Sequence, residues 1–125
     1  MPTLPLFLGI MLTSTTLPNP NILRAQVWIL TDNPRISLKF GDNQMVSGSG
    51  GCNRFTGRYR LTGTQLQIGP LASTKMACAE EIMEQESKFF QALDTAQQAR
   101  WDSQSLVITT KTGTLQFRPP INPCT

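Results

Sequence analysis

Two cysteines, Cys52 and Cys78, stand where the predicted structure of this chain changes character. Cys52 follows two glycines between strand-like runs, and Cys78 stands where a strand-rich half gives way to a helical pattern. A disulfide between them would tie a helix to a sheet, and closing a loop of about 27 residues would stabilise the fold by roughly 3 to 4 kcal/mol. Two reduced buried thiols, or one reactive thiol, are the alternatives. A disulfide would place the protein in an oxidising compartment.

The composition is that of one small globular domain. The chain has 125 residues, of which 39% are apolar and 15% charged, so it can fold around a single modest core. Its net charge of +3 comes from eleven basic residues spread along the sequence and eight acidic ones, which is typical of an ordinary solvated surface. We therefore expect no nucleic-acid partner.

The chain contains no histidine, which bears on catalysis and on metal binding. Histidine is the usual general base near neutral pH and the commonest nitrogen ligand of zinc and copper. Without it, Cys52 and Cys78 leave a metal site incomplete, and neither thiol has an imidazole partner. We predict a non-enzymatic protein with no catalytic residues, no metal site and no cofactor.

Residues 1–25 are predicted to be a signal peptide. Their apolar run, Leu4–Leu12, is long enough for the core of such a peptide and too short to span a bilayer. A small residue suited to cleavage follows at Ala25, although no basic residue precedes the run. A disordered, non-native leader is the alternative. No cysteine lies near the cleavage position, so a lipoprotein anchor is not supported. We expect an exported protein, periplasmic or extracellular, without a transmembrane span.

Short strands separated by turn residues dominate the region after residue 26. Ile36, Leu38 and Phe40 alternate with polar residues, which is the period of a half-buried strand. The segment 55–61 alternates in the same way. We expect strands at 27–30, 36–40, 44–47, 55–61, 66–68, 99–102, 106–110 and 114–117.

Between Ala79 and Ala96 the spacing of apolar residues becomes helical. The order of elements predicts an α+β fold, in which a curled antiparallel sheet of about seven to eight short strands, partly barrel-like, packs on one long helix inserted before the last three-stranded meander. We place this domain at 26–118 and a C-terminal tail at 119–125. We expect Cys124 in this tail to be free and able to cross-link to another molecule. The helical face expected to pack on the sheet comprises Ile82, Met83, Glu86, Phe89, Phe90 and Leu93.

Candidate contact residues cluster around the predicted strand 55–61. Arg54, Arg58 and Arg60 are the only local concentration of basic residues, and the alternation puts Arg58 and Arg60 on the polar face of the strand. Together with Asn53 they could receive an anionic partner, such as a carboxylate-bearing peptide or lipid head groups. Protection of a strand edge against aggregation is the alternative. The glycine cluster at 48–51 predicts a bulge or tight turn with positive φ rather than a phosphate-binding loop.

Short motifs occur in order along the chain: Trp28-Ile29-Leu30, Gly51-Cys52-Asn53-Arg54, Gly57-x-Tyr59, Leu66-x-Ile68, Thr74-x-Met76-Ala77-Cys78, a helix with Glu86, Phe89 and Leu93, and Leu115-x-Phe117. Taken together, they resemble the META domain family of bacterial HslJ-type heat-inducible proteins, from about residue 26 to 118. The resemblance implies a small α+β domain, exported or membrane-tethered, linked to stress tolerance and in some members to secretion and virulence, with no established catalytic residues. It also implies that Trp28, Gly51, Thr74 and Met76 occupy signature positions and are structural.

The lack of a catalytic constellation favours a binding or accessory role. We predict a monomeric envelope protein of the stress response that contacts a peptide, a protein, or a small apolar or lipid-like ligand. One alternative is an enzyme or enzyme inhibitor with its site in a cleft between helix and sheet. Another is a structural accessory of an envelope or secretion assembly.

Overall fold

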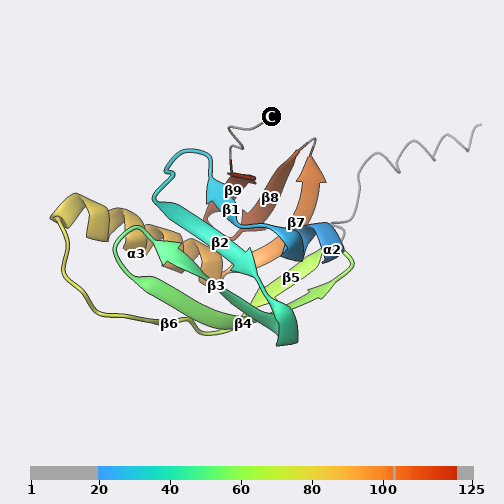
Figure 1. Cartoon of the computed structure of the whole chain (residues 1–125), viewed down its shortest axis with the longest axis horizontal. Helices are drawn as coiled ribbons and strands as arrows, with labels where there is room; N and C mark the ends of the chain where they lie inside the picture. Colours follow the sequence, from blue (N-terminus) through green and yellow to red (C-terminus); the bar gives the residue numbers. More distant parts are fainter. Residues whose placement is uncertain (1–19, 103, 121–125) are drawn as a thin grey trace, which may run out of the picture.

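The computed structural model describes residues 20–102 and 104–120, which form a closed antiparallel barrel with one long helix (Figure 1). Neighbouring strands follow the order β3-β2-β1-β9-β8-β7-β5-β4, and pairing of β4 with β3 closes the ring. A short ninth strand, β6, lies outside the ring on β4. The strands are β1 (Trp28–Leu30), β2 (Ile36–Phe40), β3 (Met45–Gly50), β4 (Arg54–Thr62), β5 (Gln65–Ile68), β6 (Ala72–Ser73), β7 (Ala96–Asp102), β8 (Ser105–Thr110) and β9 (Gly113–Arg118).

This architecture confirms the predicted α+β class, the barrel-like sheet and the meander after the helix. Two differences arise from pairing between distant segments. β3 continues through Gly48 to Gly50, where the sequence predicts a turn, because it pairs with β2 on one side and with β4 on the other. The two residues of β6 carry no strand period of their own and pair only because the chain passes beside Phe55 and Thr56.

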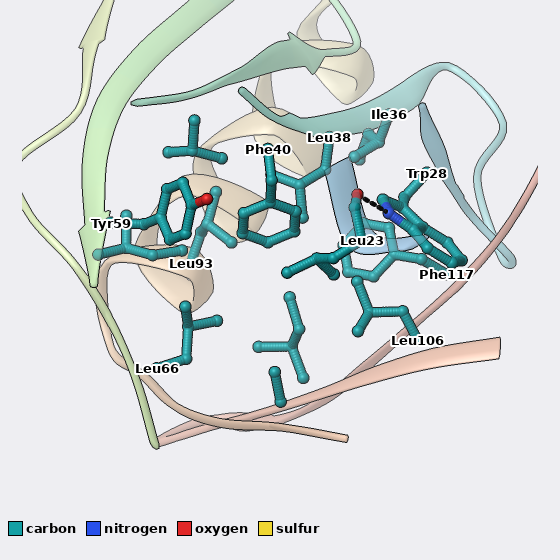
Figure 2. Packing of buried hydrophobic residues seen from close by; sticks show 14 of the residues in the cluster. Leu23, Trp28, Ile36, Leu38, Phe40, Tyr59, Leu66, Leu93, Leu106 and Phe117 are labelled. Carbon is teal, nitrogen blue, oxygen red and sulfur yellow. Dashed lines mark hydrogen bonds between the residues drawn. The ribbon is translucent and has the colours of Figure 1, made fainter. Parts of the chain in front are cut away.

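The barrel interior contains the inward-facing residues of alternate strand positions. In β2 the side chains of Ile36, Leu38 and Phe40 are buried and that of Lys39 is exposed, as the alternation predicts. Figure 2 shows these residues packed with apolar side chains from the helix and from β8 and β9. Trp28, which the family resemblance implies to be structural, is fully buried and makes an edge-to-face contact with Trp101 at 5.3 Å between ring centroids.

The long helix α3 (Glu80–Asp94) contacts β3 and β5. In Figure 1 it starts clear of the sheet and runs in behind β3. Its buried residues are Glu86, Phe89, Ala92 and Leu93, so the predicted apolar face packs on the barrel only from its second turn onward. Met83, expected in that face, is 40% exposed because the first turn of α3 lies beyond the strands.

A short helix, α2 (Pro20–Ala25), precedes β1. It falls in the range predicted as a signal peptide, yet Leu23 is only 2% exposed and belongs to the core. The Leu23 carbonyl accepts a hydrogen bond from the Trp28 indole N–H at 3.0 Å (Figure 2). The described domain therefore includes residues upstream of 26. The apolar run at 4–12 and Cys124 lie outside the described residues. In the part of the chain that the structure describes, no helix has the length and apolarity to cross a bilayer.

Candidate functional site

The Cys52 and Cys78 sulfurs form a disulfide in the structure, with their Cα atoms 6.0 Å apart. Cys52 lies in the loop between β3 and β4, and Cys78 lies two residues before α3. The bond therefore connects the sheet to the approach of the helix, as the sequence favoured. Because both sulfurs are bonded to each other, neither cysteine is available as a nucleophile or a metal ligand while the disulfide is intact.

A buried carboxylate stands beside this disulfide. Glu86 of α3 is 5% exposed, and its side chain accepts the backbone N–H of Cys52 at 3.0 Å, the backbone N–H of Asn53 and the Asn53 side-chain amide at 2.8 Å. Hydrogen bonds of this kind compensate the burial of an ionised group. Glu86 thus fixes the β3–β4 loop against the helix independently of the disulfide.

Asn53 extends the same network to the segment before α3. Its Oδ1 accepts the Thr74 hydroxyl at 2.8 Å and the Met76 N–H at 2.6 Å, while its Nδ2 also approaches the Met76 carbonyl at 3.3 Å. Asn53 is 5% exposed, and both atoms of its amide are hydrogen-bonded inside the protein. The predicted role of Asn53 as a surface contact does not fit this position, because no part of its amide is free for a ligand.

The residues expected to be structural take part in this arrangement in different ways. Thr74 donates its hydroxyl to Asn53 Oδ1. Met76 donates its backbone N–H to the same oxygen, whereas its side chain is 56% exposed. Gly51 has a φ of +113°, so the positive φ predicted for the glycine cluster at 48–51 occurs at Gly51, directly after the end of β3 at Gly50. The sequence pattern missed the role of Glu86. The available signal was an acidic residue placed inside the apolar stripe of the helix.

The three arginines lie on the outer face of β4, where they alternate with the buried Phe55 and Tyr59. All three are exposed, and we call them the arginine face. Arg58 and Arg60 line one hollow of about 570 Å³. Arg54 lies near the other end of β4 and lines a different hollow of about 510 Å³. The structure therefore brings Arg58 and Arg60 together and places Arg54 apart from them.

A separate cleft lies between α3 and the rim of the barrel. It has a volume of about 600 Å³. The turn after β1 and the β8–β9 hairpin form its other walls, and a hydrogen bond of 3.0 Å from Asn33 to Gln85 links the turn to the helix. The apolar residues that line the cleft are Leu30, Ile36, Phe89, Ala92 and Leu115.

The hollows on the described surface differ in the side chains that line them. Glu86 does not line the cleft, where the acidic side chain is the exposed Asp32. Within residues 20–102 and 104–120, no group of three histidine, cysteine, aspartate or glutamate side chains is placed to hold a metal ion. The candidate sites are therefore a charged polar hollow on the barrel wall and a mainly apolar cleft beside the helix.

The fold and the disulfide-linked loop define the chain as a small α+β barrel domain with one packed helix. The chain belongs to the META domain family, because the sequence model of the META domain matches residues 23–120. This range includes Leu23 of α2 as well as the barrel. It also contains both cysteines and the Asn53–Glu86 network.

Comparisons with individual proteins agree with this assignment. The chain is 30% identical to heat shock protein HslJ of Escherichia coli (strain K12) over 91 residues, which cover 72% of this chain and 64% of HslJ. The match thus spans less than two thirds of the length of HslJ. A protein structure solved by NMR is 28% identical, covers 82% of this chain and 95% of its own, and superimposes with a TM-score of 0.66.

Two more distant structures show likeness of fold alone. An NMR structure of a protein from Burkholderia xenovorans is 24% identical, with coverage of 83% and 90% of the two chains and a TM-score of 0.67. A DUF4847 family protein from Bacteroides vulgatus is 14% identical, with coverage of 78% and 94% and a TM-score of 0.62. The barrel is therefore maintained in these proteins at low sequence identity.

Proposed function

We propose that this chain is a non-enzymatic binding protein of the bacterial cell envelope, and that it contacts an acidic peptide or protein segment through the arginine face. The observation that carries the proposal is the exposure of Arg54, Arg58 and Arg60 on one face of β4, two of them beside a hollow of about 570 Å³. Arginine forms paired, charge-assisted hydrogen bonds with carboxylates, so an acidic segment is its natural complement.

Two further observations support the envelope part of the proposal. The disulfide between Cys52 and Cys78 favours an oxidising compartment, which in bacteria lies outside the cytoplasm. The relative HslJ carries the name of a heat shock protein, which supports a role for this chain under stress. On this basis we propose that the protein is exported.

Removal of the arginine side chains tests the contact directly. The experiment measures binding of acidic, neutral and basic peptides of one length to the wild type and to the Arg54→Gln/Arg58→Gln/Arg60→Gln variant. The matched control is Arg35→Gln/Arg100→Gln/Lys111→Gln, which removes the same charge from other exposed positions. We expect the wild type and the control to prefer the acidic peptide and the first variant to lose that preference. Equal losses in both variants would reduce the effect to net charge and contradict the proposal.

The cleft beside α3 favours a second candidate function, the binding of a small apolar ligand. Its lining is mainly apolar and its volume of about 600 Å³ lies in the usual range of small-molecule sites. The neutral fluorescent probe N-phenyl-1-naphthylamine can report such binding. We expect Thr114→Trp, at the rim of the cleft, to abolish the probe signal and Thr62→Trp, an exposed position on β4, to preserve it. An unchanged signal in Thr114→Trp would place the probe elsewhere.

A further inference from the structure

The strands β2, β3 and β4 form a second polar surface on the outside of the barrel. They lie side by side in Figure 1, because β3 pairs with both of its neighbours. In each strand the buried side chains, such as Leu38, Val46 and Phe55, alternate with side chains that point outward. The outward side chains align in two rows across the strands, which are Ser37, Ser49 and Arg54 in one row and Lys39, Ser47 and Thr56 in the other.

All six outward residues line one hollow of about 510 Å³. Its floor lies on the central strand, because the outward side chains of β3 here are the short Ser47 and Ser49. Lys39 and Arg54 are exposed and stand on the two flanking strands, which are roughly 10 Å apart. Both side chains are long enough to lean over the serines, so they can contact one ligand together.

The backbone around the hollow is held in place by hydrogen bonds. The Arg54 N–H donates to the Thr74 hydroxyl at 3.2 Å, and the Arg54 carbonyl accepts the Thr74 N–H at 3.0 Å. The Ser49 hydroxyl accepts the Gly51 N–H at 3.1 Å, which leaves its own proton for another acceptor. The hollow is therefore preformed, as small-molecule sites usually are.

The charged side chains that line the hollow are both basic. Lys39 and Arg54 give it two positive charges, and no acidic residue of the described chain lines it. The hollow beside Arg58 and Arg60 differs, because its lining includes Asp94. The remaining polar side chains between the two cations are hydroxyls, each of which can donate a hydrogen bond to an oxygen atom. This combination favours an anion that has several oxygen atoms.

We infer that this hollow binds a phosphate monoester. Such a group has three acceptor oxygens and a charge of about −1.5 to −2 at neutral pH, which matches the two positive charges of the lining. A carboxylate has two oxygens and a single charge, so it engages fewer of the available donors. The hollow is large enough for a polar carrier of the phosphate, such as a sugar, which contacts the remaining hydroxyls. The phosphate belongs either to a soluble sugar phosphate or to the head group of a lipid.

The inference goes beyond the proposed function and does not rest on it, although Arg54 belongs to both surfaces. The phosphate site needs Lys39 and the hydroxyls of β2 and β3, whereas Arg58 and Arg60 line another hollow. Lys39→Gln should therefore weaken the binding of phosphate and preserve the preference for acidic peptides. Arg58→Gln/Arg60→Gln should have the opposite effects, so each claim can fail without the other.

The test compares probes that differ in the charged group. Glucose 6-phosphate presents a phosphate monoester, glucuronate presents a carboxylate on a similar sugar, and glucose has no charge. Phosphatidylcholine vesicles that contain phosphatidate present a phosphate monoester on a lipid, and vesicles that contain phosphatidylglycerol present a phosphate diester. Binding to the whole chain is measured at constant ionic strength, by calorimetry for the sugars and by cosedimentation for the vesicles. Backbone amide shifts in NMR spectra locate the contact.

We expect glucose 6-phosphate to bind more tightly than glucuronate and to shift the amide signals of residues 47–49. Its affinity should fall roughly tenfold or more in Lys39→Gln/Arg54→Gln, because both charge-assisted contacts are lost. The matched control is Arg100→Gln/Lys111→Gln, which removes one arginine and one lysine at exposed positions outside the hollow. This control should bind glucose 6-phosphate as the wild type does.

A second variant separates the hydroxyl floor from the charges. Ser37→Ala/Ser47→Ala preserves both cations and should weaken the binding of glucose 6-phosphate several-fold, because two hydroxyl donors are removed. The pH dependence identifies the phosphate. The second proton of a phosphate monoester dissociates near pH 6, so the affinity should rise between about pH 5 and about pH 7. The affinity for glucuronate should stay level over this range, because its carboxylate is already ionised.

The vesicles distinguish the two sources of the phosphate. Tighter binding to vesicles with phosphatidate than to vesicles with phosphatidylglycerol would identify a lipid head group, and binding of glucose 6-phosphate alone would identify a soluble ligand. Equal affinities for glucose 6-phosphate and glucuronate would overturn the inference, as would equal losses in the two charge variants. Failure of both phosphate monoesters to bind would also overturn it.

Discussion

Glu86 and Asn53 form one hydrogen-bonded unit that joins three segments of the chain. The carboxylate of Glu86 accepts three hydrogen bonds from the β3–β4 loop, and Asn53 in turn holds Thr74 and Met76. Every donor in this unit meets an acceptor, and both side chains are buried. Because each group has a fixed hydrogen-bonding role, exchanging an oxygen for an amide nitrogen is costly even though the shape is unchanged.

Exchanging the carboxylate and the amide between positions 86 and 53 tests whether the two side chains act as one unit. Glu86→Gln should lower the free energy of unfolding by about 1 to 3 kcal/mol, because its new NH₂ group would face another N–H donor. Asn53→Asp should also lower the free energy of unfolding, because the new carboxylate at position 53 would face the carboxylate of Glu86. In the double variant the new amide can donate to the new carboxylate, so part of the loss should be recovered.

Urea unfolding of the four proteins measures this coupling. Glu84→Gln, at an exposed position of the same helix, is the control and should leave stability within about 0.5 kcal/mol of the wild type. A double variant whose loss equals the sum of the single losses would show that the two side chains act separately.

Gly50 is required where β3 meets α3. A Cβ atom at this position would lie 2.6 Å from Cγ of Glu86 and 2.7 Å from a ring carbon of Phe90. We expect Gly50→Ala to cost about 1 to 3 kcal/mol in unfolding free energy, because helix and strand would be forced apart. Gly69→Ala is the control, since the nearest atom to its Cβ would be 3.8 Å away. Similar midpoints of thermal unfolding for the two variants would contradict this account.

At the scale of elements, α2 contributes to the core through Leu23. The side chain is 2% exposed, and its carbonyl accepts the indole N–H of the fully buried Trp28. A chain cut after Ala25 would lose both contacts, whereas a chain cut before Pro20 would preserve them. We therefore expect an exported form of the protein to contain Leu23, and intact mass measured on protein from the periplasm can determine this.

The contribution of α2 to stability can be measured separately from processing. Leu23→Ala should lower the free energy of unfolding by about 2 to 5 kcal/mol, the usual cost of a cavity at a buried leucine. A chain that begins at residue 26 should lose at least as much, because the indole N–H of Trp28 also loses its acceptor. Val27→Ala, at a partly exposed position, is the control. A stable chain from residue 26 would show that α2 is dispensable.

The sequence predicted the elements whose burial follows a local period. β2 and β4 alternate between buried and exposed positions, and α3 has the helical stripe expected of it. The pattern could not identify elements that depend on distant partners. The sequence predicted a turn at Gly48 to Gly50, but these residues belong to β3, because they pair with strands on both sides. The residues of α2 include no acidic residue and follow an apolar run, so the sequence predicted them to be part of a leader.

The candidate site was predictable in its residues and less so in its geometry. Alternation along β4 placed Arg58 and Arg60 on the outer face, as the structure has them. The same reasoning grouped Asn53 with them, although the amide of Asn53 turns inward to Glu86. It could not indicate the bulge at Gln97, because a register shift between β7 and β8 leaves no trace in local composition.

For the molecule as a whole, the disulfide and the Asn53 network connect the same two regions by independent means. The disulfide joins residues 26 apart in sequence, while Asn53 holds Met76 through a hydrogen bond of 2.6 Å. Cys52→Ser/Cys78→Ser should therefore lower the free energy of unfolding by roughly 3 to 4 kcal/mol, because the unfolded chain gains freedom. The barrel itself should persist, since the network still orders the approach to α3.

Counting free thiols on protein made in its native compartment tests whether the disulfide forms there. The chain has three cysteines. In an oxidising compartment we expect Cys52 and Cys78 to resist alkylation in denaturant until a reductant is added, with a mass change that corresponds to two further thiols after reduction. The doubly substituted variant serves as the control, because reduction should expose neither of these thiols in it. Full alkylation of the wild type without reductant would show that the disulfide is absent in the cell, and the argument for export would then lose its structural support.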